Sequence, residues 1–216
     1  MRTWFPAQGL LFDSDGVLVD SDASVISAWT RWAQRYDLDP AEIVALVHGR
    51  RSADTVSMVI PRRHRAEALL LIDSYEIEDA ASVRALPGAD ELLRALPDSA
   101  WAVVTSALAP LARARLTAAG LPEPPVLITA DLVAEGKPAP EGYLKGSAGL
   151  GLPATACVVF EDAASGITAA RAAGAAAVIG IGARSVAAGV DTAVRSLSGV
   201  RFQDGHVDLC QADVLP

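Results

Sequence analysis

Short apolar runs recur along the chain, and each is bounded by polar or turn-forming residues. They cover residues 9–12, 101–105, 126–129, 156–160 and 175–181. Runs of this length without polar alternation are typical of strands that are buried on both faces of a parallel sheet. Segments with helical periodicity lie between them, at residues 109–119, 142–150 and 165–173. Alternating strands and helices predict an α/β fold in which helices cover both faces of the sheet.

A different pattern follows the first apolar run. The next residues show helical periodicity without a convincing strand, and the helices they predict cover residues 23–36, 40–47, 52–59 and 65–75. Pro40 fits the first turn of its helix, and Ser52 is placed to cap the start of the helix after it. Strand and helix alternate again only after Leu86-Pro87-Gly88.

These two patterns divide the chain into a core and an insertion. We predict an α/β core of residues 1–19 and 84–216, with a helical domain of residues 20–83 inserted after the first strand. Near the end of the chain, Asp204-Gly205 stands between two β-like runs, which predicts a terminal hairpin. Covering an edge of the sheet is the one role we can suggest for this hairpin.

The composition is that of a globular protein with a substantial core, since 51% of the 216 residues are apolar and 20% are charged. A net charge of −8 disfavours nucleic acid and anionic membranes as partners. No apolar run is long enough to span a bilayer, and the first residues lack the apolar segment of a signal peptide. Cys157 and Cys210 are expected to stay unpaired, and we therefore expect a cytoplasmic protein. We expect it to be a monomer or a weak homodimer.

Polar side chains come at the ends of three predicted strands. Asp13 follows the first strand, Thr105 ends the second, and Glu161 and Asp162 follow the fourth. The carboxyl ends of parallel strands meet at one edge of a sheet, where ligands bind. Carboxylates gathered there suit Mg²⁺, which prefers oxygen ligands. A lone Asp-x-Asp-Gly is as consistent with a strand-ending turn, but the agreement between strands favours a metal site.

Lys137 is a further candidate for the site. It is one of only two lysines, beside sixteen arginines, and it lies between Gly136 and Pro138 shortly after the third predicted strand. A compact ammonium there can neutralise both an attacking carboxylate and a phosphoryl group. Lys145, the other lysine, is expected on a helix surface.

Four motifs in this order carry a family resemblance: DSDGVLVDS, VVTS, GKPAP and VVFEDAASGITAARAAG. They resemble the haloacid dehalogenase-like (HAD) superfamily, over nearly the whole chain and in a highly specific combination. The resemblance implies a Rossmann-like parallel-sheet core, and it implies that the inserted helices are a C1-type cap. The stretch HGRRSADT and the segments around VVTS and GKPAP resemble the sugar-phosphate phosphatases of the phosphoglucomutase-like branch.

The resemblance implies a role for each matching acidic residue. Asp13 would be the nucleophile that forms an aspartyl-phosphate, and Asp15 would protonate the leaving oxygen and then activate water. Mg²⁺ would be held by the side chains of Asp13 and Asp162 and by the backbone carbonyl of Asp15. Glu161 would orient a water on the metal.

The remaining motif residues would contact the phosphoryl group. Thr105 would donate its hydroxyl to the phosphoryl oxygens, with the backbone amide of Ser106 nearby, and Lys137 would compensate the charge. Ser14 stands where the family usually has an apolar residue. We expect a change of packing there and no loss of chemistry.

The segment HGRRS is the predicted cap loop that closes over the substrate. The alternative is a helix-connecting turn with exposed arginines. Its substrate-binding candidates are His48, Gly49, Arg50 and Arg51, and the weaker candidates elsewhere in the cap are Glu76, Trp29 and Trp32.

The predicted activity is a Mg²⁺-dependent phosphatase that acts on a small phosphorylated sugar or polyol. The main alternative is a β-phosphoglucomutase-like mutase, and a less favoured one is a catalytically silent binding or regulatory module. Ser52 and Val25 stand where those mutases carry a cap arginine and a cap histidine, which favours hydrolysis. Arg50 and Arg51 nevertheless remain available to grip a second phosphate.

Overall fold

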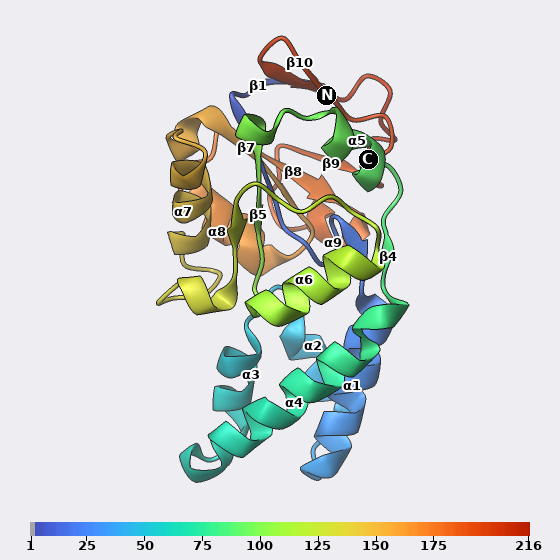
Figure 1. Ribbon diagram of the computed structural model, residues 1–216, viewed down its shortest axis with the longest axis vertical. Coiled ribbons are helices and arrows are strands. Elements are labelled where there is room, and N and C mark those ends of the chain that lie inside the picture. Colours follow the sequence, from blue (N-terminus) through green and yellow to red (C-terminus); the bar gives the residue numbers. More distant parts are fainter. Residues whose placement is uncertain (1–2) are drawn as a thin grey trace.

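A six-stranded parallel sheet forms the centre of the computed structural model, which describes residues 3–216 (Figure 1). Its order is β6-β5-β2-β7-β8-β9, so β2 lies between β5 and β7. The strands are β2 (Gly9–Phe12), β5 (Trp101–Val104), β6 (Leu127–Ile128), β7 (Cys157–Glu161), β8 (Ala177–Ile181) and β9 (Thr192–Val194). The predicted Rossmann-like α/β fold is confirmed.

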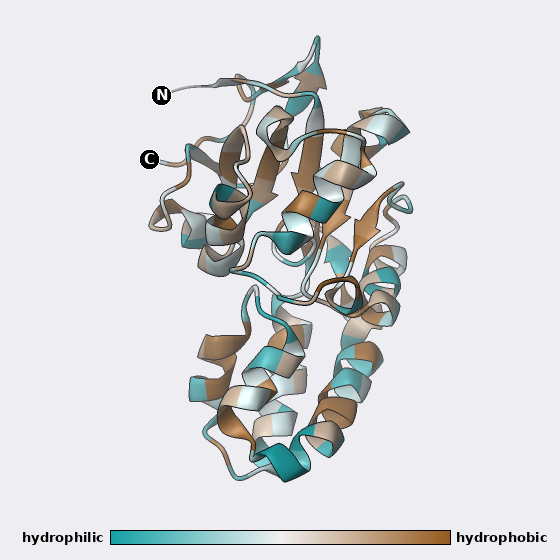
Figure 2. Cartoon of the chain, turned by 90° about the vertical axis from the view of Figure 1, so that its left-hand side faces the viewer, coloured by the Kyte–Doolittle hydropathy of each residue, from teal (hydrophilic) through white to brown (hydrophobic). Residues whose placement is uncertain are grey.

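Alternate strand residues pack into two hydrophobic layers, one on each face of the sheet. Leu10 and Phe12 of β2 share a cluster with side chains of α5 (Ala89–Ala95) and α6 (Ala109–Ala118). Leu11, between them, belongs to the opposite cluster with α7 (Glu141–Gly149) and α8 (Ala164–Ala172). Figure 2 shows the resulting apolar strands in brown. Burial on both faces explains why these strands appear as continuous apolar runs.

Four helices form the cap, which lies below the core in Figure 1. They are α1 (Asp22–Arg35), α2 (Pro40–Val47), α3 (Ser52–Val59) and α4 (Arg65–Asp79). Trp32 is fully buried at their centre, and its indole Nε1 donates to the Ala68 carbonyl at 2.8 Å. Trp32 is therefore part of the cap core and does not reach a substrate. Within residues 3–216, no helix is both long and apolar enough to cross a membrane.

The chain enters and leaves the cap through a small antiparallel ribbon. Strands β3 (Val19–Asp20) and β4 (Arg84–Ala85) pair with each other. They coincide with the division predicted at residues 19/20 and 83/84. This supports the proposed division into a core of residues 1–19 and 84–216 and a cap of residues 20–83.

A second, three-stranded sheet lies at the end of the core far from the cap (Figure 1). It contains the predicted terminal hairpin, β10 (Arg201–Gln203) and β11 (His206–Asp208), with β1 (Trp4–Pro6) paired to β11. The hairpin does not cover an edge of the main sheet. Residues 213–215 cover the β9 edge instead, through a bridge between Val194 and Val214.

Three of the four cap helices begin at the predicted residue, and α1 begins one residue earlier, at Asp22. Pro40 opens α2 as expected. Ser52 is the first residue of α3 and does not cap it, because the N-cap position belongs to Arg51. The Ser52 hydroxyl instead donates to Oε2 of Glu76 on α4 at 3.1 Å. This bond joins two cap helices at the surface that faces the core.

Candidate active site

The carboxyl ends of β2, β5 and β7 bring the predicted polar residues together at the sheet edge that faces the cap. The backbone amide of Asp13 still donates to the Phe160 carbonyl at 3.0 Å, and that of Thr105 donates to the Ile128 carbonyl at 2.9 Å. These ladder bonds fix the two residues relative to the sheet. Their side chains are therefore held by the most rigid part of the fold.

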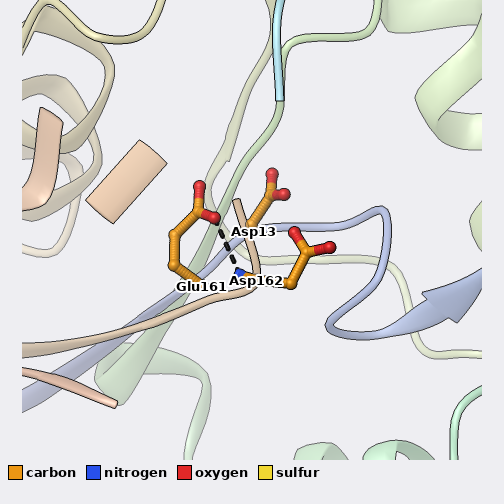
Figure 3. Close-up of side chains that lie close together, drawn as sticks. All are labelled: Asp13, Glu161 and Asp162. Carbon is orange, nitrogen blue, oxygen red and sulfur yellow. Dashed lines mark hydrogen bonds between the residues drawn. The ribbon is translucent and has the colours of Figure 1, made fainter. Parts of the chain in front are cut away.

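Three carboxylates converge at this edge, from Asp13, Glu161 and Asp162 (Figure 3). Each offers an oxygen that lies within 4.8 Å of the others, and all three side chains are buried. The amides of Asp162 and Ala163 donate to Oε2 of Glu161 at 2.8 and 2.9 Å, which turns that carboxylate inward. Because this much negative charge is buried together, a cation is needed to balance it.

Both oxygens of the Glu161 carboxylate accept hydrogen bonds. Its Oε1 accepts from Lys137 Nζ at 2.7 Å and from the Tyr143 hydroxyl at 2.9 Å. A Cβ at Gly166 would overlap the carboxylate, so the start of α8 can pass this close only with glycine at that position. The sequence gives no signal for Tyr143, which reaches the site from α7.

Lys137 is the one ammonium in the described site. Its Nζ lies 2.8 Å from Oδ1 of Asp13 and 2.7 Å from Glu161, and the residue is buried. Burial alone would lower the pKa of Lys137, but the two carboxylates outweigh burial and raise it. Lys137 therefore keeps its positive charge. Lys145, as predicted, lies on a helix surface, where it pairs with Glu141.

The acidic cluster fits a divalent cation. Burial, followed by repulsion from Glu161, raises the pKa of Asp162 to about 7. Burial also raises the pKa of Asp13 well above its ordinary range, although Lys137 opposes this. The positive charge near these two carboxyl groups is thus too small to keep their pKa values in the ordinary range. A hard cation with oxygen ligands such as Mg²⁺ would supply that charge, and the donors present match it.

The excess of buried negative charge predicts how the stability of the metal-free protein depends on pH. The pKa of Asp162 is about 7 in the folded chain and ordinarily 3.8, so the folded state binds its proton more tightly. In a chelator, stability should fall as pH rises from about 4 to about 7, by at most about 1.4 kcal/mol per pH unit for this group. Thermal unfolding of wild type and Asp162→Asn across this window measures the slope. The variant should show a shallower decline, and an equal or steeper one would contradict the assignment.

Asp15 lies beside the cluster and directly precedes a turn that begins at Gly16. Gly16 has a φ of 78°, and a Cβ there would overlap the Asp162 carboxylate. Oδ1 of Asp15 is 3.0 Å from Arg115 Nη1. The second terminal nitrogen of Arg115 is 3.1 Å from Oε1 of Glu76, on the cap. A buried arginine thus links Asp15 to the cap.

Arg184 is a second arginine that the motifs do not reveal. It lies on α9 (Ala183–Val186), and its Nη2 lies 2.9 Å from Oδ2 of Asp162 and 3.1 Å from Oδ1 of Asp22 on cap helix α1. This pair leaves about half of the arginine side chain exposed. Core and cap are therefore joined by ion pairs on two sides of the site.

The cap loop is held against the core by Ser106, which follows β5, and by Ser165 of α8. The Gly49 carbonyl accepts hydrogen bonds from the hydroxyls of Ser106 and Ser165, both at 3.1 Å. Gly49 has a φ of 70°, and a Cβ there would collide with Ser165 and Ala163. Only glycine lets the loop approach this closely.

A cavity lies between the acidic cluster and the cap. Several predicted residues line it, namely Asp13, Asp15, His48, Gly49, Ser106 and Asp162. Trp29 and Glu76 also line it. Thr105 lies outside this lining, as does Lys137, which contacts Asp13 directly. Burial lowers the pKa of His48, so its imidazole is neutral at pH 7.

The two predicted arginines of the cap loop are not brought into this cavity. Arg51 forms a bidentate salt bridge with the Asp54 carboxylate, with hydrogen bonds of 2.8 and 2.9 Å, and it also donates to the Ala134 carbonyl. Arg50 is exposed and contacts the Met58 sulfur. A substrate-binding role for either stays a prediction.

Comparisons with known proteins agree with this geometry. Residues 7–174 match the model of the haloacid dehalogenase-like hydrolases. Hexitol phosphatase A of Escherichia coli (strain K12) is 41% identical over 172 residues, which cover 77% of this chain and 80% of the relative. Glycerol-1-phosphate phosphohydrolase 2 of Saccharomyces cerevisiae is 34% identical over 176 residues, covering 76% and 70%.

Solved structures extend the similarity to the fold as a whole. The β-phosphoglucomutase of Clostridium difficile superimposes with a TM-score of 0.81 over 91% of this chain and 94% of its own, at 19% identity. At that identity the similarity concerns the fold alone. With the family match and the close relatives, it defines an α/β hydrolase with a helical cap. The chain belongs to the haloacid dehalogenase-like hydrolase family.

Proposed function

We propose that the protein is a Mg²⁺-dependent phosphatase that hydrolyses a small sugar or polyol phosphate through an aspartyl-phosphate on Asp13. The observation that carries this proposal is the buried Asp13 carboxylate, held by Lys137 within an acidic cluster that fits a divalent cation. Asp15 faces the same cavity. The two relatives described above are named for a hexitol and for glycerol 1-phosphate, which supports the substrate class.

The first step transfers the phosphoryl group to the protein. A carboxylate oxygen of Asp13 forms a bond to phosphorus while the bond from phosphorus to the sugar oxygen breaks. Asp15 gives its proton to that oxygen, so the polyol leaves as a neutral alcohol. Lys137 orients Asp13 and favours its ionised form. Mg²⁺, held by Asp13, Asp162 and the Asp15 carbonyl, would neutralise the charge of the transferring group.

The second step returns the protein to its starting state. Asp15, now a carboxylate, takes a proton from water as the water oxygen bonds to phosphorus and the Asp13–phosphorus bond breaks. Inorganic phosphate leaves, and Asp15 is protonated again. The Thr105 hydroxyl and the Ser106 amide would hold the phosphoryl oxygens through both steps.

The charges around the cavity favour an uncharged leaving group. Five carboxylates line it against two arginines; the carboxylates can accept hydrogen bonds from sugar hydroxyls, and their excess negative charge disfavours a second phosphate. The two arginines in the lining already pair with carboxylates, Arg115 with Asp15 and Glu76, and Arg184 with Asp162 and Asp22. A mutase must hold a bisphosphate, so this lining supports hydrolysis over mutation.

We further propose that the protein acts in the cytoplasm as a monomer or weak homodimer, on a free small molecule and on neither nucleic acid nor membrane. Both cysteines are free thiols: Cys157 is buried in the core, as expected, and Cys210 is exposed. The net charge of −8 is repulsive toward nucleic acid and anionic lipid.

The proposal is tested by measuring inorganic phosphate released from hexose, pentose, hexitol and glycerol phosphates in Mg²⁺. β-Glucose 1-phosphate with a bisphosphate primer is included, and glucose 6-phosphate is followed in parallel. We expect stoichiometric phosphate release from one group of polyol or sugar phosphates. Isomerised sugar phosphate without net release would identify a mutase and contradict the proposal.

A further inference from the structure

Arg115 lies at the junction of three segments that the chain keeps far apart. It belongs to α6 of the core, whereas Asp15 follows β2 and Glu76 lies on cap helix α4. Its Nη1 is 3.0 Å from Asp15 and its Nη2 is 3.1 Å from Glu76. Only 3% of the arginine side chain is exposed. The guanidinium is therefore buried between a candidate catalytic carboxylate and the cap.

Stability alone is a poor reason for this arrangement. Burying a guanidinium with two carboxylates carries a desolvation cost that hydrophobic side chains of similar volume avoid. The third nitrogen of the group, Nε of Arg115, has no hydrogen-bond partner among residues 3–216. The arrangement instead supplies geometry, because a planar guanidinium can hold two acceptors in fixed directions and an ammonium cannot.

The link continues into the cap. Oε2 of Glu76 accepts from the Ser52 hydroxyl at 3.1 Å, so the chain of contacts runs from Asp15 through Arg115 and Glu76 to α3. Ser52 is the last residue of the HGRRS segment, whose His48 and Gly49 line the cavity. The orientation of Asp15 is thus connected by a chain of polar contacts to two helices of the cap.

We propose that Arg115 is a positioning residue that orients the Asp15 carboxyl group through its contact with Oδ1 and is itself held in place by Glu76 of the cap. The inference rests on the proposed function, in which Asp15 gives a proton to the leaving oxygen. Seating α4 against the core fixes the guanidinium, and the guanidinium in turn directs the other Asp15 oxygen toward the cavity. Proton donation is thereby coupled to the position of the cap.

Two substrates with different leaving groups distinguish this positioning role from a merely structural one. A sugar or polyol alkoxide is a poor leaving group and needs the proton from Asp15, whereas p-nitrophenolate leaves without one. Arg115→Lys keeps the charge but cannot hold both carboxylates. We expect it to lower kcat for a hexitol phosphate about 100-fold, the order of a general-acid contribution, with KM nearly unchanged. Because Asp15 also activates water in the second step, the comparison with p-nitrophenyl phosphate uses the first turnover alone, in which the burst of p-nitrophenolate should keep a rate close to wild type.

Glu76→Gln is the second variant, and it does not depend on Arg115→Lys folding well. It keeps the shape of the side chain but removes the charge that holds Arg115 in place. We expect the same selective loss with the hexitol phosphate, smaller than that of Arg115→Lys. The matched control is Arg113→Lys on the same helix, where the side chain is exposed and pairs with Glu123, and both substrates should be unaffected.

The outcomes distinguish this inference from the proposed function. Selective loss with the hexitol phosphate in both variants supports it. Equal losses in the first-turnover rates on the two substrates, or no loss on either in a variant whose thermal unfolding matches wild type, would overturn it while leaving the phosphatase assignment intact. A wild-type protein that releases phosphate from neither substrate in Mg²⁺ would overturn the proposed function and this inference with it.

Discussion

Replacing Asp13 by asparagine is expected to abolish phosphate release, with a loss on the order of 10⁵-fold in kcat. The amide is neutral and cannot form the acyl-phosphate, and no other carboxylate takes its position after β2. The fold should remain, because asparagine has the same shape and Lys137 keeps its bond to Glu161. Phosphate release and thermal unfolding, measured side by side, test both statements.

A matched control separates chemistry from the loss of a charge. Asp98 is exposed and begins the short helical turn that leads into β5, at the end of the strand opposite to the site. Asp98→Asn should therefore retain full activity. Turnover that survives Asp13→Asn would show that this carboxylate is not the nucleophile. A wild-type chain without turnover on any phosphate ester would instead favour the silent binding module.

Removing the metal is expected to reduce turnover at least about 100-fold, because the metal contributes several kcal/mol to phosphoryl transfer. Asp13, Glu161 and Asp162 bury three carboxylates beside a single ammonium, and a phosphate ester adds further negative charge. Without a divalent cation the substrate is repelled and Asp13 tends to stay protonated. Phosphate release after dialysis against a chelator measures the effect.

The same experiment contains its own control. Adding Mg²⁺ back should restore the rate, and Asp162→Asn should require a higher Mg²⁺ concentration for half of its maximal rate. Full turnover in excess chelator would contradict the metal assignment and with it the role of Asp162. A rate that Mg²⁺ does not restore would point to irreversible unfolding, which thermal unfolding detects.

Most of the fold could be predicted because its strands are buried on both faces and its helices are bounded by glycine and proline. Four strands are absent from the prediction for local reasons. Strands β3 and β4 have only two residues each. Strand β9, Thr192–Val194, is too short for a period to be recognised, and β1 contains Pro6, which argues against a strand. Ser52 was misassigned because a serine before a helix suits a cap, whereas here its hydroxyl bonds across to Glu76.

The acidic residues of the site could be predicted because they sit at strand ends within recognisable motifs. Lys137, which pairs with Asp13 and Glu161, could be predicted as well, but the two arginine partners of the site could not. Arg115 is separated from Asp15 by 100 residues and sits in a helix rich in Ala, Leu and Arg, where nothing marks it among sixteen arginines. Arg184 meets Asp22 only because the cap folds back onto the core. Such contacts depend on how helices pack, which a local pattern does not encode.

The most direct test of the central claim is to trap the phosphorylated protein. A ³²P-labelled polyol phosphate that the phosphate-release assay identifies as a substrate would be mixed with enzyme and Mg²⁺, quenched in acid within one turnover, and digested. The account predicts acid-stable label on the peptide that contains Asp13 and none in Asp13→Asn. Full single-turnover phosphate release with no labelled peptide, or with label on another residue, would contradict it.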